Sequence, residues 1–233
     1  MSYRRLAPGH IQETAVKLSR RISERFPESG LSKVSQEVVA VADKAAAISL
    51  WISRPILWFR AGVGLFILIL LAVILMALFN LRVHLRFQTI SELLQGIEAA
   101  INDIVFIGLA ILFLVTWENR MKRSRALKAL HELRSLAHII DMHQLTKDPE
   151  RILNKDTSST QSSPVREMTS FELTRYLDYC SESLAILSKI AAVYVENFED
   201  PVTLAAVNEL ENLTSGLSRK IWQKIMILDR AMM

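Results

Sequence analysis

The chain has 233 residues, of which 51% are hydrophobic and 22% are charged, and its mean hydropathy is +0.24. Soluble globular proteins normally fall below zero on that scale, so the composition points to a lipid environment. The single cysteine, Cys180, excludes an intramolecular disulfide framework and any zinc or iron–sulfur site built from several cysteines.

Residues 1–55 predict a cytosolic segment of two amphipathic helices. The first, at 9–26, carries one apolar stripe at helical spacing, formed by Ile11, Ala15, Leu18, Ile22 and Phe26. Its other faces carry four cations that we consider candidates for contact with a membrane surface: Lys17, Arg20, Arg21 and Arg25. This helix either lies on the inner leaflet or packs its stripe on the rest of the cytosolic domain. Two glutamates dilute the basic face and favour packing slightly.

The second helix is expected at 32–53, with Ser32 as its N-cap. The chain then bends at Pro55, because the residue before a proline is pushed away from helical backbone angles. Pro27 and Gly30 separate the two helices.

Residues 56–118 predict a transmembrane helical hairpin. The first span, at about 59–81, contains 21 consecutive residues without a charge, and about 20 apolar residues suffice to cross a bilayer. Trp58 and Arg60 precede that run as interfacial anchors. The second span, at about 99–118, has a shorter uncharged run that ends at Trp117. A re-entrant or interfacial segment is the alternative for this second run.

Orientation follows from the cations beside the spans. The short outer loop, 82–98, carries only Arg82 and Arg86, whereas the chain after the second span is strongly basic, with Arg120, Lys122, Arg123 and Arg125 as the nearest cations. We therefore expect an integral protein of a bacterial inner membrane with both termini in the cytoplasm. This flanking bias accounts for most of the excess of 28 Lys and Arg over 24 Asp and Glu, so nucleic acid is not an expected partner.

The start of the outer loop has two interpretations. Residues 81–87 alternate between apolar and polar side chains, as a strand does, but a helical spacing also runs through them into the second span. We expect a helix from about residue 88 and leave 81–87 open.

The rest of the chain predicts cytosolic helices. The second span continues into a cytosolic segment, 119–153, as a helix that runs to about residue 144. A Ser/Thr-rich linker follows at 154–168, and a helical hairpin occupies 169–233. Its first helix runs to about 197 and begins at Thr169 or Ser170. Asp200 caps the second helix, and Gly216 breaks or bends it. No heptad pattern is sustained long enough to predict a long coiled coil.

Polar residues in the second span are the first candidate site. Glu98 and Asn102 share a helical face with Thr116, and Asp103 lies beside them. Ionisable residues inside a membrane are costly and often functional, and rings of carboxylates form the mouths of cation-selective pores. The alternative places these residues at the interface, with Asp103 paired to Arg82 or Arg86.

The histidines and the cysteine give little indication of a metal site or a catalytic site. His131, His138 and Asp141 supply too few ligands for one metal ion. Cys180 has acidic neighbours, which disfavour a reactive thiolate. No phosphate-binding loop and no hydrolase or metalloprotease motif occurs. We therefore expect no enzyme activity, no cofactor and no metal.

The fold class is thus all-α, an integral membrane protein with a two-span hairpin and cytosolic amphipathic helices on both sides. The leading hypothesis is a non-enzymatic assembly or scaffold subunit whose partners are the lipid bilayer and either its own copies or other subunits of a larger complex. The alternative is a homo-oligomeric ion channel lined by the second span. The two-span arrangement with acidic residues before the second span resembles small oligomeric cation channels in outline, although no motif carries residues over.

Overall fold

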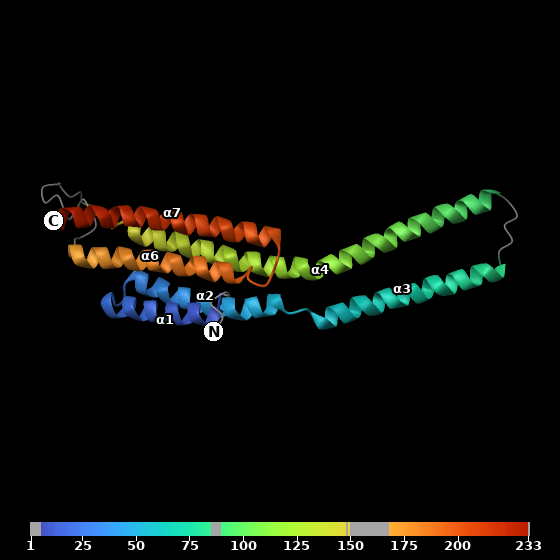
Figure 1. Cartoon of the computed structure of the whole chain (residues 1–233), viewed down its shortest axis with the longest axis horizontal. Helices are drawn as coiled ribbons and strands as arrows, with labels where there is room; N and C mark the ends of the chain where they lie inside the picture. Colours follow the sequence, from blue (N-terminus) through green and yellow to red (C-terminus); the bar gives the residue numbers. More distant parts are fainter. Residues whose placement is uncertain (1–5, 85–89, 148, 150–167, 233) are drawn as a thin grey trace. The chain divides into compact units, whose positions relative to one another are not determined.

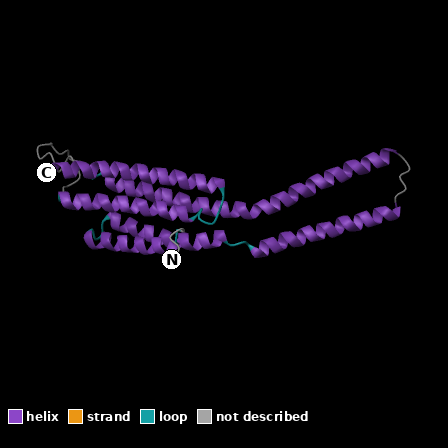
Figure 2. Ribbon diagram, in the orientation of Figure 1, coloured by secondary structure: helices purple, strands orange, loops and turns teal. Residues whose placement is uncertain are grey.

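The computed structural model describes residues 6–84, 90–147, 149 and 168–232. Every regular element in this part of the chain is an α-helix (Figure 2), which confirms the all-α class. The helices are α1 (Pro8–Arg25), α2 (Gly30–Ser53), α3 (Leu57–His84), α4 (Ile90–Leu145), α6 (Ser170–Val193) and α7 (Pro201–Met232) (Figure 1). The expected linker lies outside the described residues except for Met168.

The chain divides into two compact units. The bundle unit comprises Met1–Ser53 and Arg123–Met233, and the apolar unit comprises Arg54–Lys122. Helix α4 contributes to both, its N-terminal part to the apolar unit and its C-terminal part to the bundle unit.

Helix α6 is the central element of the bundle unit. It packs against α7, α1 and α2, and Figure 1 shows it beside them. Side chains on nearly all of its faces are buried, among them Leu177, Tyr179 and Cys180, because a helix with apolar groups all round needs neighbours on every side. The apolar stripe of α1 enters the same core, so the packing interpretation of this helix is confirmed.

Local chemistry sets most helix ends. Thr169 accepts a hydrogen bond from the backbone N–H of Glu172, whose carboxylate accepts one from Thr169 in return, a capping box that confirms the predicted start of α6. Asp200 caps α7 by accepting from the N–H of Thr203 at 2.9 Å, without the reciprocal bond of a capping box. The prediction for α2 was wrong by three residues. Ser29 accepts from the N–H of Ser32, so Ser32 lies inside the first turn.

Two further boundaries differ from expectation. Helix α7 continues through Gly216 without a break. A glycine costs a helix about 1 kcal/mol, and the neighbouring Thr214 and Leu217 are buried and hold the helix in place. Helix α3 extends to His84, so residues 81–84 are helical rather than a strand. Residues 85–87, the rest of that open segment, lie outside the described residues.

Helix α7 buries a regular stripe that the sequence did not reveal. Its buried positions repeat at steps of three and four residues: Thr203, Val207, Leu210, Thr214, Leu217, Ile221, Ile225 and Leu228. That spacing is the seam of a coiled coil. Two of the positions are threonines, which is why a search for apolar heptads missed it. Both hydroxyls are satisfied locally, Thr203 by Asp200 and Thr214 by the carbonyl of Leu210.

The apolar unit has the opposite character. Helices α3 and α4 are both long and apolar enough to cross a membrane, as predicted. Their large apolar side chains point outward, among them Leu65, Leu68, Leu75, Ile104, Phe106 and Leu112. Helix α4 runs unbroken from Ile90 to Leu145, which confirms that the second apolar run continues directly into the helix that follows it.

Candidate functional site

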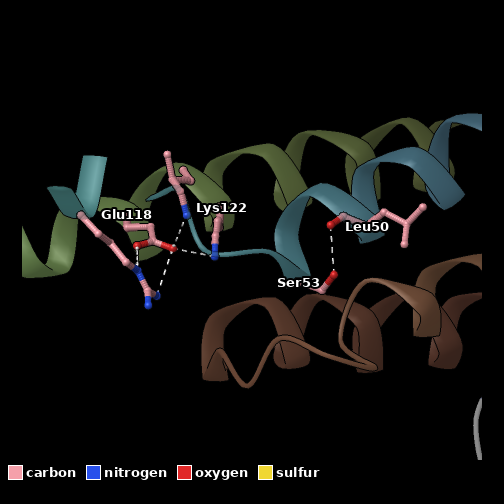
Figure 3. A network of polar contacts seen from close by, with 6 residues as sticks. Leu50, Ser53, Glu118 and Lys122 are labelled. Atoms are coloured by element: carbon pink, nitrogen blue, oxygen red, sulfur yellow. Dashed lines mark hydrogen bonds and ion pairs between the residues drawn. The ribbon is translucent and has the colours of Figure 1, made fainter. Parts of the chain in front are cut away.

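A cluster of charges lies at one end of the apolar unit, around Glu118 of α4. Its partners are Arg60 of α3 and Lys122, one turn further along α4. The side chains of Glu118 and Lys122 are each 7% exposed, whereas that of Arg60 is 61% exposed. Figure 3 shows the Glu118 carboxylate with Lys122 beside it.

The Glu118 carboxylate contacts three nitrogen groups. Arg60 Nε donates to Glu118 Oε2 at 2.8 Å, and Lys122 Nζ lies 2.8 Å from Oε1. The backbone N–H of Ile56 also donates to Oε1, at 3.4 Å. Ile56 immediately precedes α3 and Arg60 lies in its first turn, whereas Glu118 and Lys122 belong to α4. The carboxylate therefore links the two apolar helices at this end. Charge-assisted hydrogen bonds of this kind are stronger than those between neutral groups.

An apolar groove lies between the same two helices, next to the charge cluster. Its volume is about 500 Å³ and it is lined by Trp58, Phe59, Gly62, Val63, Phe66, Ala110, Phe113 and Leu114. Leu114 precedes Glu118 by four residues, which is about one helical turn. The charge cluster therefore lies about one turn beyond the last residue of α4 that lines the groove.

Arg120 adds a third cation to this end. Its guanidinium lies over the ring of Phe113, 5.9 Å from the ring centroid, within the range of a cation–π contact. Phe113 also stacks edge-on against Trp117. Of the predicted interface anchors, Trp58, Arg60, Trp117, Arg120 and Lys122 thus all lie at one end of the apolar unit.

The remaining two predicted anchors belong to the bundle unit. Arg123 Nε donates to both oxygens of Asp200, at 2.9 and 3.0 Å, and Arg125 lies over the ring of Trp51 at 4.6 Å. Burial would raise the pKa of Asp200, but hydrogen bonds from Arg123 and Thr203 outweigh it and hold that pKa below its usual value. Sequence spacing had not indicated that these arginines fasten helices together.

The polar candidates of the second span fall on two faces of α4. Asp103 precedes Ala110 by seven residues, two full turns, so it shares the face that lines the groove towards α3. Glu98 and Asn102 lie about a third of a turn around the helix. All three side chains are exposed. The hydroxyl of Thr116 donates back to the carbonyls of Leu112 and Phe113, so its helix already satisfies it. Arg82 and Arg86, the expected partners of Asp103, lie among residues whose side chains are not described.

The basic residues of α1 have separate environments. Arg21 forms an ion pair with Glu182 at 3.4 Å and lies over Tyr179, and Arg25 lies over Phe171. Lys17 and Arg20 are exposed, and Arg20 lines a hollow of about 290 Å³ between α1 and α2. The structure does not gather these four cations into one site.

The structure shows the surroundings of Cys180 and of one histidine from the same stretch as those considered from the sequence. Cys180 is fully buried on α6, and burial raises the pKa of its thiol to about 12. No group of three His, Cys, Asp or Glu side chains within the described ranges could hold a metal ion. His143 instead packs against Gly30, which has no side chain to obstruct the ring.

The sequence analysis proposed interface anchors at this end but did not predict the Glu118 cluster. The one feature of the sequence that indicates this cluster is local: Glu118 lies four residues before Lys122 at the end of an apolar run, a spacing at which the two side chains of a helix can pair. Arg60 is 58 residues away, and no spacing rule connects the two. Comparisons with protein-family models, with curated proteins and with solved structures find no match to this chain.

Proposed function

We propose that this protein is a non-enzymatic, membrane-anchored assembly subunit. Its apolar unit would be the anchor, and its bundle unit would carry the contacts with other copies or partner subunits. The observation that carries this proposal is the contrast between the two units. Apolar side chains face outward along α3 and α4, where lipid could cover them, whereas the bundle unit buries its own apolar stripes.

The bundle unit also supplies a candidate contact surface. Trp222 and Met226 lie one turn apart on α7, and their side chains are 55% and 51% exposed. Trp and Met are enriched at protein interfaces relative to the remaining surface. Their neighbour Gln223 is an exposed polar residue of the same turn and supplies a matched control.

The experiment is the mass of the particle extracted in mild detergent, measured by light scattering with correction for bound detergent. We expect the wild-type chain to form a homogeneous particle of several chains, or a fixed-ratio complex with another protein. Trp222→Ala with Met226→Ala should release single chains, and Gln223→Ala should not. A wild-type particle that contains one chain alone would contradict the proposal.

A pore is the second candidate. Glu98 and Asn102 are both exposed on α4, so copies of the chain could bring these residues together around an axis. In liposomes that contain the assembled protein, Asp103→Asn together with Glu98→Gln tests this function. Loss of ion flux with intact assembly would favour the channel over the scaffold, and unchanged flux would exclude the pore.

A further inference from the structure

We infer that the groove between α3 and α4 binds one acyl chain of an anionic phospholipid, whose phosphate is held by Arg120. This inference rests on the proposed membrane location and deepens it by naming a specific lipid site.

The shape and lining of the groove fit a hydrocarbon chain. All eight lining residues are apolar or glycine, and they come from facing stretches of two apolar helices. At Gly62 an added Cβ would meet nothing within 4 Å, so the missing side chain leaves open space in the wall. An empty apolar groove on a helix pair in a bilayer would be filled by the surrounding lipid tails, because lipid is the apolar solvent there.

The charge at the end of the groove selects the head group. Arg60 and Lys122 pair with the single carboxylate of Glu118, and Arg120, whose guanidinium lies over Phe113, adds a further positive charge at this end. Lys122 is buried against Glu118, whereas Arg60 is largely exposed. Arginine presents several donors in a planar fork that suits phosphate oxygens. Arg120 already lies over Phe113 of the groove wall, so one residue pair joins the cationic and apolar parts of the site.

The position of Trp58 supports the same inference. Trp58 is 75% exposed at the same end of α3, and indole rings favour the head-group level of a bilayer. The indole ring of Trp58 would therefore lie at the level of the lipid head group. The guanidinium of Arg120 would contact the phosphate, and the groove would hold one acyl chain.

The test is native mass spectrometry of the full chain in mild detergent, with phosphatidylglycerol or phosphatidylcholine added at equal concentration. Wild type should retain phosphatidylglycerol in preference to phosphatidylcholine. Arg120→Gln should weaken that retention about fivefold, the effect expected for one cation near an anionic surface. Lys128→Gln, which removes an exposed cation two turns further along α4, should leave it unchanged.

The groove has its own matched pair of variants. Gly62→Leu fills it and should reduce retention of phosphatidylglycerol. Gly64→Leu makes the same change at a position with equally open space that does not line the groove, and should not. Glycerol phosphate, which has the head-group charge without a tail, should fail to compete with the lipid.

Three results would overturn the inference: no preference for phosphatidylglycerol, equal retention by the Gly62→Leu and Gly64→Leu variants, or competition by glycerol phosphate. These outcomes differ from failure of the proposed function, in which alkaline carbonate would extract the chain from membranes. A chain that resists carbonate but shows no lipid preference would retain its membrane anchor and lose only this site.

Discussion

Removal of the Asp200 carboxylate should destabilise the bundle unit more than any change at an exposed ion pair. Asp200 is 6% exposed and caps α7, where it accepts from both the N–H and the hydroxyl of Thr203. Loss of an N-cap costs about 1 kcal/mol. Thr203 is fully buried, so its unsatisfied donors add about 1–3 kcal/mol. We therefore expect Asp200→Ala to lower the free energy of unfolding by about 2–4 kcal/mol.

Asp200→Asn separates the cap from the charge. Asparagine is as good an N-cap as aspartate and still offers an oxygen to Thr203, so this variant should lose only the charged pairing with Arg123. Glu209→Ala supplies the control, because it removes a carboxylate of α7 whose ion pair with Arg134 is exposed on both sides. Its effect should be near zero.

The assay uses the one cysteine of the chain. Cys180 is buried on α6 with a pKa raised to about 12, so a maleimide should react with it only when the bundle unit opens. When opening and closing are faster than labelling, the rate reports the free energy of opening. A loss of about 2–4 kcal/mol corresponds to about 30- to 700-fold faster labelling. Equal rates in Asp200→Ala and Asp200→Asn would refute the reasoning, because the cap would then contribute nothing.

Two further predictions also concern the free energy of unfolding. The first is measured by denaturant unfolding, because maleimide reacts with the thiolate and labels too slowly below pH 4. The second uses the labelling rate of Cys180. The folded pKa of Asp200 is lowered, so the stabilisation from its charge is fully present above the unfolded pKa of about 3.9 and is lost as pH falls through the lower folded value. The stability difference between wild type and Asp200→Asn should therefore shrink as pH falls below about 4, and a difference that grew would contradict the pairing with Arg123. Gly30→Ala should destabilise the chain by about 1–3 kcal/mol, the usual cost of overpacking, because the new methyl group would overlap the ring of His143. In a His143→Ala background the same change should cost much less, and equal costs in both backgrounds would exclude the clash.

The elements that the sequence predicted well depend on local or continuous signals. An uncharged run of 21 residues has few interpretations other than a membrane span. The caps at Thr169 and Asp200 likewise follow from hydrogen bonds between residues three apart. Such signals need no knowledge of the rest of the fold.

The features that the sequence left open depend on the partners of each helix. The stripe of α1 has the same spacing whether lipid or protein covers it, and only the bundle core decides between them. The pairing of Arg60 with Glu118 joins residues of two different helices. Arg123 illustrates the same limit, because its charge suggested a membrane anchor whereas its position on α4 brings it to Asp200.

The central claim is that α3 and α4 cross a membrane and leave both flanking segments on one side. The most direct test adds single cysteines to the intact chain, whose own Cys180 is buried, and labels them with a membrane-impermeant maleimide in vesicles of known orientation. The positions are exposed ones: Lys17→Cys before α3, Gln95→Cys near the start of α4 and Asn208→Cys on α7. The account predicts that Lys17→Cys and Asn208→Cys label from the cytoplasmic face and Gln95→Cys only from the opposite face. Labelling of all three from the same face would contradict it.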